Sequence, residues 1–385
     1  MKKTIAIVLS VLMLIGIMPM ALAADASAET AKLQFHEDGT FKILNISDIQ
    51  DGADLLNITA NFMRAAIEAE DPDLIILTGD NISGYRTLAA NKTEKGIRAY
   101  MDIFEEYGIP VAIVFGNHDE YESGLTKEEQ MAIYNEYSCS ISVDDGEDIW
   151  GCGTYNVPIY ASADDTKVAF NCWLFDTGDR DENGGYDHVK ESQLDWYKKT
   201  SNALKEANGG EVVPSIAFQH IIVPEIYDAL TVVPASTQGA VYKYGKAYVL
   251  PETAAEGSVL GESPCPSGIN GGEFDAFLEQ GDVLAIVSGH DHCNSFVIPY
   301  KGIDLVNTPT CGFRSYGINE SRGIRVINLD ESDLTTYETS VVSFDDYFAD
   351  DFGQMFVYNF YGFVGKLYTF FYGLWTRIQS TLGLD

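Results

Sequence analysis

Five segments of the chain are continuously apolar and rich in β-branched residues, and each is followed at once by a polar cluster. The segments span residues 41–46, 74–78, 111–115, 214–218 and 283–288. Short apolar runs without alternation are typical of strands that are buried on both faces of a sheet. Because the carboxyl ends of such strands form the binding edge of an open sheet, we expect the polar clusters to come together.

Amphipathic segments with helical spacing lie between these runs, and they predict helices at residues 57–70, 93–107, 127–137 and 191–207. Residues 168–175 predict another strand. After residue 292 the pattern predicts strands at 295–299, 303–307, 323–329 and 335–342. An order of βαβ units followed by strands alone predicts an α/β (α+β) fold, a sandwich of mixed sheets with helices outside.

Two regions depart from this alternation. Residues 226–272 are rich in Pro, Gly and Tyr, and they indicate an inserted loop region over the site. Residues 352–382 are apolar and aromatic, with polar or small residues at helical spacing, so they predict an amphipathic helix with a wide apolar face. The pattern leaves open whether this helix packs against the domain itself, a membrane surface or a partner protein. Lys366, near its middle, disfavours a membrane span.

The N-terminal segment has the organisation of an export signal. Lys2 and Lys3 precede an apolar stretch at residues 5–18, and Ala21-Leu22-Ala23 resembles a cleavage site. We therefore predict a signal peptide at 1–24, a main domain at 25–344 and a C-terminal helical segment at 345–385. The expected location is secreted or extracytoplasmic, with the C-terminal helix as an option for attachment at the cell surface.

The composition narrows the choice of partners. Of the 385 residues 58 are acidic and 24 basic, and the net charge of -34 repels nucleic acid, so no nucleic-acid partner is expected. Bound cations would still allow a small phosphate ester to be held. The 6 cysteines are an even number, and export permits disulfides, for which Cys139 with Cys152 is the favoured pair.

The polar clusters carry side chains that bind metals. The predicted ligands are Asp48, Gln50, Asp80, Asn117, His220, His290 and His292. Carboxylate and amide oxygens combined with imidazoles suit iron, zinc or manganese. Two cations about 3.5–4 Å apart would clamp a phosphoryl group and lower the pKa of a water molecule, which then attacks phosphorus as hydroxide. His118 is the expected general acid, and Asp119 is placed to orient it.

Each of these residues also has a structural explanation when taken alone. A Gly-Asp or Gly-Asn pair is more often a turn than a ligand, and a single histidine such as His220 is more often part of a core. The chain has only 6 histidines, however, and four of them follow the predicted strands. This concentration favours a metal centre.

The order of the motifs resembles the calcineurin-like metallophosphoesterase superfamily, and more closely its purple-acid-phosphatase-like branch. The motifs are Asp48-Ile49-Gln50, Gly79-Asp80-Asn81, Gly116-Asn117-His118-Asp119, Gln219-His220 and Gly289-His290-Asp291-His292. The resemblance implies a four-layer α/β/β/α sandwich with two mixed sheets, hydrolysis of phosphate mono- or diesters, and two divalent or trivalent metal ions. It also implies that Asp48, Asp80 and His292 hold the first metal. The second would be held by Asp80, Asn117, His220 and His290.

This sequence departs from the family pattern at two positions. Gln50 stands where the family usually has a histidine ligand, and Ser83 stands where the coloured purple acid phosphatases have a tyrosine. We expect a weakened first metal site. Arg314 and His188 are candidates for substrate contacts, although an arginine paired with a surface carboxylate explains Arg314 equally well.

Two further functional classes stay open at this point. One is a degenerate protein that binds a phosphorylated ligand without turnover, as the loss of the histidine at Gln50 would allow. The other is a surface interaction protein with a structural metal site.

Overall fold

The computed structural model describes residues 32–146 and 148–382, so the predicted signal peptide lies outside the described residues. Two mixed β-sheets form the centre of the fold. The first has the strand order β15-β14-β1-β2-β3, in which β1, β2 and β3 are parallel and β14 is antiparallel to β1. Its strands are β1 (Thr40–Ile46), β2 (Leu74–Thr78), β3 (Val111–Val114), β14 (Ile324–Asp330) and β15 (Glu338–Val342).

The second sheet has the order β10-β12-β13-β11-β6-β5-β4, and its parallel strands are β5, β6, β11 and β13. Its strands are β4 (Tyr155–Ala161), β5 (Asp164–Phe175), β6 (Ser215–Gln219), β10 (Val259–Leu260), β11 (Val283–Ser288), β12 (Asn294–Tyr300) and β13 (Ile303–Asn307). All residues of β2 and β6 are buried, as continuous apolar runs predict for central strands.

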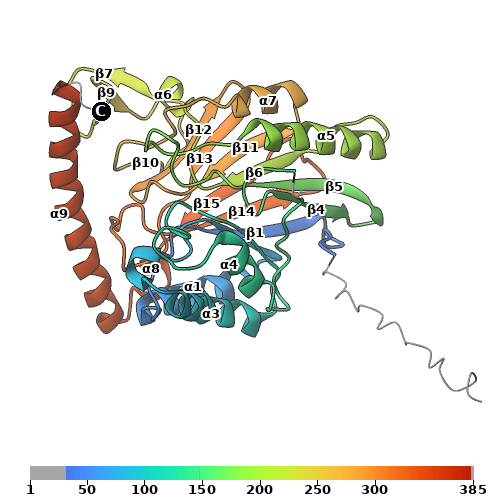
Figure 1. Ribbon diagram of the computed structural model, residues 1–385, viewed down its shortest axis with the longest axis horizontal. Helices are drawn as coiled ribbons and strands as arrows, with labels where there is room; N and C mark the ends of the chain where they lie inside the picture. Colours follow the sequence, from blue (N-terminus) through green and yellow to red (C-terminus); the bar gives the residue numbers. More distant parts are fainter. Residues whose placement is uncertain (1–31, 147, 383–385) are drawn as a thin grey trace, which may run out of the picture. The chain divides into compact units, whose positions relative to one another are not determined.

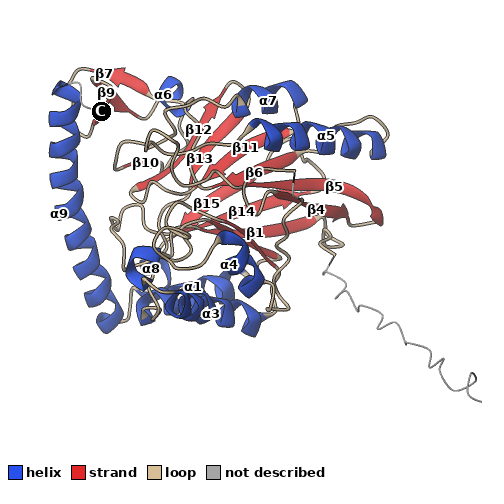
Figure 2. Cartoon of the chain, viewed as in Figure 1, coloured by secondary structure: helices blue, strands red, loops and turns tan. Residues whose placement is uncertain are grey.

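Helices cover the outer faces of both sheets, so the layers run helix, sheet, sheet, helix (Figures 1 and 2). The larger helices are α1 (Asn57–Glu70), α3 (Ala90–Tyr107), α4 (Lys127–Tyr134), α5 (Glu191–Ala207), α7 (Glu273–Gln280) and α9 (Phe352–Leu382). Three shorter ones are α2 (Gly84–Thr87), α6 (Ile226–Ala229) and α8 (Phe344–Phe348). The predicted fold class is confirmed.

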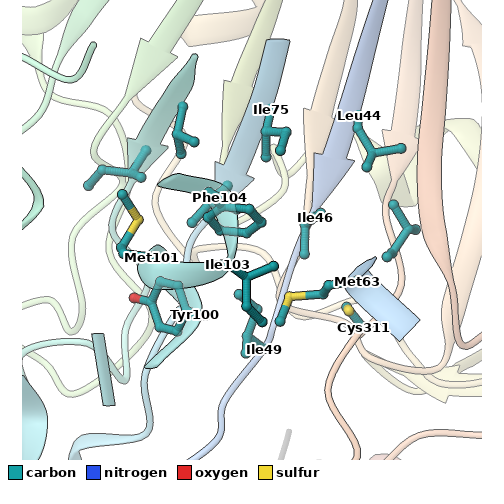
Figure 3. Packing of buried hydrophobic residues seen from close by; sticks show 14 of the residues in the cluster. Leu44, Ile46, Ile49, Met63, Ile75, Tyr100, Met101, Ile103, Phe104 and Cys311 are labelled. Atoms are coloured by element: carbon teal, nitrogen blue, oxygen red, sulfur yellow. The ribbon is translucent and has the colours of Figure 1, made fainter. Parts of the chain in front are cut away.

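Three apolar cores hold these layers together. The middle core lies between the two sheets and includes Ile43, Ile76, Phe170 and Phe218. On the outer side of the first sheet, residues of β1 and β2 pack against α1 and α3, as Ile46, Met63 and Phe104 illustrate (Figure 3). The third core joins the second sheet to α5 and α7. Burying both faces of each sheet fixes the strand ends at one edge.

The strands and helices predicted from the pattern occur with shifts of a few residues. In the second sheet and the helices that cover it, strand β4 and helix α7 were not predicted. The region 226–272 is more ordered than a loop. It contains α6 and a three-stranded sheet of β7 (Thr231–Val233), β8 (Val241–Lys243) and β9 (Lys246–Val249), in the order β7-β9-β8.

The predicted disulfide between Cys139 and Cys152 is wrong. All six cysteines are free thiols, and these two lie within the apolar core of the first sheet. Burial raises the pKa of each of the two thiols to about 12, which keeps them protonated. Both therefore serve as small apolar residues of the core.

The predicted C-terminal helix is present as α9, and it docks along the body beside α8 and β8 (Figure 1). Tyr358, near its start, stacks on Phe344 with ring centroids 5.2 Å apart. Near its end, Ser380 Oγ accepts a hydrogen bond of 2.7 Å from the backbone N–H of Gly245. No described helix combines the length and apolar character needed to cross a membrane.

Candidate metal centre

The predicted ligands leave their strands through sharp backbone turns. Asp48, Gln50, Asp80 and His290 all have positive φ angles, of 52°, 42°, 48° and 71°. Side chains other than glycine seldom adopt this conformation, and such residues cluster at functional sites. The turns redirect the side chains from the sheets into one shared space.

Two glycines of the motifs allow a close approach between loops. A Cβ atom on Gly116 would lie 2.3 Å from Asp80 Oδ1, and one on Gly289 would lie 1.9 Å from Ser47 Oγ. Real Cβ contacts are never that short, so any larger residue would push the ligand loops apart. The glycine before Asn117 and the one before His290 are therefore spatial requirements of the site.

The ligands form two buried groups that share one carboxylate. Asp48, Asp80 and His292 make the first group, and Asp80, His220 and His290 make the second. Within each group one potential ligand atom per residue lies within 4.8 Å of the others. Asp80 is the carboxylate that the two groups share, and it lies between them.

Backbone carbonyls fix the orientation of two imidazoles. His220 Nδ1 donates to the carbonyl oxygen of Thr78 at 2.9 Å, and His292 Nδ1 donates to that of Tyr316 at 2.9 Å. With one proton on Nδ1, the atom of each neutral ring that carries the lone pair is Nε2, and this atom faces the site. A hydrogen bond of this kind is the usual support of a metal-binding histidine.

Whether metal ions fit the site depends on the atoms that face it, and these atoms are hydrogen-bond acceptors. His220 Nε2 lies 3.2 Å from Asn117 Oδ1 and 3.3 Å from Asp80 Oδ1, and His292 Nε2 lies 3.2 Å from Asp48 Oδ1. Asp48 Oδ1 is buried and accepts no hydrogen bond from the described residues. Lone pairs held this close repel one another unless a cation or proton lies between them. The donor set therefore fits metal ions.

The shifts in pKa also show that these side chains lie close together. Although burial opposes it, the Asp80 carboxylate raises the pKa of His220 to about 10. Burial would raise the pKa of Asp80, but His220 and His118 lower it below its usual value. Burial together with His220 lowers the pKa of His290, so this ring stays neutral and keeps a free lone pair.

The loop after β3 carries Asn117, His118 and Asp119. The backbone N–H of His118 donates to Asp80 Oδ1 at 2.8 Å, which places this residue beside the bridging carboxylate. Both carboxylate oxygens of Asp119 accept backbone N–H groups, from Gly116 at 2.6 Å and from Ile82 at 2.9 Å. Asp119 therefore fixes the shape of the loop that carries His118.

Gln50 occupies its predicted place but makes a different contact. Its amide nitrogen donates a hydrogen bond of 2.5 Å to Asp80 Oδ2. An N–H donor cannot coordinate a cation, so this amide supports the bridging carboxylate through its nitrogen. In this arrangement the first metal would have three side-chain ligands: Asp48, Asp80 and His292.

The two predicted substrate residues are engaged elsewhere. Arg314 Nε lies 3.3 Å from Asp51 Oδ1, and its Nη2 donates to the carbonyl oxygen of Asp54 at 2.8 Å. The alternative explanation, an arginine paired with a carboxylate, therefore describes it, and it fastens the loop after Gln50. His188 Nδ1 lies 3.2 Å from Asp187 Oδ1, so the His188 ring is held by a residue of its own loop.

Three residues around the ligands were not assigned these contacts from the sequence. Tyr316 stacks on His292, with ring centroids 4.2 Å apart and an angle of 6° between the planes. Glu262 Oε2 accepts from the Tyr316 hydroxyl at 3.1 Å, and Tyr186 lies edge-on to His290 at 4.3 Å. Their loops follow no motif, so only the tertiary structure shows these contacts.

A buried pair of ligand groups that share a carboxylate, at the edge of an α/β/β/α sandwich, is the arrangement of a metallophosphoesterase. Comparison with known families agrees: residues 41–294 match the family described as calcineurin-like phosphoesterase, and this chain belongs to that family. The resemblance seen in the sequence is confirmed.

Similar proteins carry related names. "Probable inactive purple acid phosphatase 14" of Arabidopsis thaliana is 31% identical over 77% of this chain and 77% of its own length. "Phosphatase DCR2" of Saccharomyces cerevisiae is 24% identical over 69% of this chain and 46% of its own. Among solved structures, a dimetal phosphatase from Danio rerio aligns with a TM-score of 0.48 and 14% identity, covering 79% of this chain and 99% of that one.

Proposed function

We propose that this protein is a metal-dependent hydrolase of small phosphate esters, acting on monoesters or diesters. The observation that carries the proposal is the pair of acceptor groups joined by Asp80. Iron, zinc or manganese ions bound there would polarise a phosphoryl oxygen and lower the pKa of a water molecule. The four-residue loop from Gly116 to Asp119 then supplies both a ligand, Asn117, and a proton donor, His118.

The roles of the chain's own residues follow from their contacts. His118 is half-buried and is attached through its backbone to the bridging carboxylate, so its ring is proposed to protonate the leaving oxygen. Asp119 positions that loop through its two backbone hydrogen bonds. Arg314 and His188 remain candidates for outer substrate contacts only after a rearrangement of their present ion pairs.

Binding without turnover is the second candidate. It is favoured by the Gln50 contact, which leaves the first metal with fewer nitrogen ligands, and by the words "probable inactive" in the names of similar proteins. A weak first site would still be filled when the metal is abundant. The two candidates therefore differ in whether added metal produces turnover.

The test is hydrolysis of aryl phosphate mono- and diesters by the full chain, first treated with chelator and then supplied with Mn²⁺, Zn²⁺ or Fe²⁺. We expect no activity with chelator and recovery with metal. His118→Ala should keep its metal but lose far more rate on esters with poor leaving groups than on activated ones, because a good leaving group needs little protonation. Asp80→Asn should lose metal binding and activity together.

Three outcomes separate the candidates. Two bound metals without turnover of any ester would establish the binding protein. Full activity in excess chelator would overturn the metal-dependent mechanism. Loss of metal from His118→Ala would show that His118 acts as a ligand or supports one.

Export is proposed from residues 1–24 alone, and it is tested by following cleavage of the tagged precursor.

A further inference from the structure

An amphipathic helix usually packs its apolar face on a core, but helix α9 turns its apolar face outward. Its side against the body carries glycine, serine and tyrosine: Gly362, Gly365, Ser380 and Tyr358 are its buried residues. Its outward side carries large apolar residues that are 45% to 68% exposed, namely Phe356, Phe360, Phe363, Leu367, Phe371 and Leu374. Stability of the chain alone would favour the reverse arrangement, because burying a phenylalanine gains far more than burying a glycine.

The inner contacts show that this orientation is fixed. A Cβ atom on Gly365 would lie 1.7 Å from the carbonyl oxygen of Gly317, so only glycine permits the helix to lie this close. The Tyr358 hydroxyl donates to the carbonyl oxygen of Asn319 at 3.3 Å, and Tyr368 packs on Tyr316 at 4.3 Å. The helix is therefore held with its apolar side facing away from the body.

The outward side is long and wide. At about 1.5 Å per residue, the 31 residues of α9 extend over roughly 46 Å. From Phe352 and Phe370 on one flank to Val357 and Trp375 on the other, the apolar residues cover roughly 140° of the circumference. A single partner helix would occupy only a narrow seam of such a surface. A planar apolar phase would cover all of it.

The charges of α9 favour a lipid surface over a second copy of the chain. The chain has 58 acidic residues, yet none lies between Phe352 and Leu382, so no carboxylate of the helix would have to enter the apolar phase. The two cations lie at the flank: Lys366 pairs with Glu320 at 2.5 Å, and Arg377 covers the ring of Tyr242. Two copies joined through α9 would instead bring two bodies of strong negative charge together.

We propose that α9 is a membrane-docking surface that lies parallel to a lipid bilayer and inserts its outward phenylalanines into the boundary between headgroups and acyl chains. The helix would act as an interfacial segment, which agrees with the finding that no described helix could span a bilayer. The attachment is apolar, so high salt should leave it intact. The proposal is independent of whether the metal centre is active.

Vesicle flotation of the full chain tests this directly. The probes are phosphatidylcholine vesicles, and vesicles that also contain phosphatidylglycerol, each at low salt and at about 1 M NaCl. The test variant is Phe360→Gln/Phe363→Gln/Phe371→Gln. The matched control, Val212→Gln/Val232→Gln/Leu278→Gln, changes three exposed apolar residues elsewhere. We expect wild type and control to float with phosphatidylcholine vesicles at both salt concentrations.

The test variant should bind at least about a thousandfold more weakly, because each of the three lost phenylalanines contributes about tenfold or more. Its circular dichroism and metal content should match wild type, since the changed residues face away from the body. Failure of wild type to float, or equal flotation of the test variant, would overturn the proposal. A wild-type dimer that becomes monomeric in the test variant, without flotation, would assign the surface to a second copy.

Discussion

Replacing Tyr316 by alanine should weaken the metal site that contains His292. The Tyr316 ring lies between two others: it stacks on His292 at 4.2 Å and packs against Tyr368 at 4.3 Å with an angle of 32° between the planes. Its hydroxyl donates to Glu262 Oε2. Alanine removes the ring but keeps the backbone carbonyl that accepts from His292 Nδ1. The imidazole would thus keep its tautomer and lose the surface that holds its plane.

The size of the effect follows from these contacts. An aromatic stack contributes about 0.5–1.5 kcal/mol, which corresponds to roughly a twofold to twelvefold change in an equilibrium constant. Neighbours that support a metal ligand typically change metal affinity by about 10- to 100-fold. We therefore expect Tyr316→Ala to bind Mn²⁺ at the site that contains His292 about tenfold more weakly than wild type. Loss of the Glu262 contact would move the value toward the upper limit.

The measurement is a titration of Mn²⁺ against a competing chelator, which reads metal affinity without depending on catalysis. Tyr316→Phe keeps the ring and should stay close to wild type. Tyr361→Ala is the matched control, because its ring contacts Phe313 at 5.7 Å and no ligand. Wild-type affinity in Tyr316→Ala, or an equal loss in Tyr361→Ala, would refute a positioning role for the stack.

Three further expectations concern other parts of the molecule. Gln50→His should raise affinity for the first metal, because imidazole coordinates better than an amide; equal Mn²⁺ titrations of the two proteins would contradict this. Lys127→Met should lower the free energy of unfolding by about 3–5 kcal/mol in urea titrations, because it leaves the buried Asp176, 2.7 Å away, without its partner. Lys198→Met breaks an exposed ion pair with Glu279 and should leave the free energy of unfolding almost unchanged, and similar losses in both variants would refute the argument. Burial raises the pKa of Glu273 to about 8 from 4.5, so its folded form binds the proton more tightly and wild-type stability should fall as pH rises between these values. Glu273→Gln should be more stable than wild type at pH near 8 in the same titrations, and an unchanged pH dependence would count against it.

The sequence determined the framework of the fold and most of the ligand set. Apolar runs without alternation are typical of central strands, and the carboxyl ends of neighbouring parallel strands share an edge, so the polar clusters after these runs could be expected there without a structure. Only the tertiary structure brings the end of β2, with Asp80, to the end of β6, with His220, because these strands belong to different sheets. The glycines of the motifs belong to the same information, since Gly116 and Gly289 admit no larger side chain at the ligand loops. The helix at 352–382 was equally visible from its spacing.

Only the tertiary structure decided contacts between segments that share no local pattern. The contact of Tyr368 with Tyr316, which in turn stacks on His292, joins helix α9 to two loops that are distant in the sequence, and no periodicity records it. The amide of Gln50 has both a donor and an acceptor, and its neighbour Asp80 selected the donor. Cys139 and Cys152 could pair by count alone, but their placement in the core keeps them as thiols. For the same reason, the sequence left open which face of α9 packs against the body. A helical period defines two faces, and which of them meets the body depends on whether the opposing surface leaves room for a side chain or only for glycine.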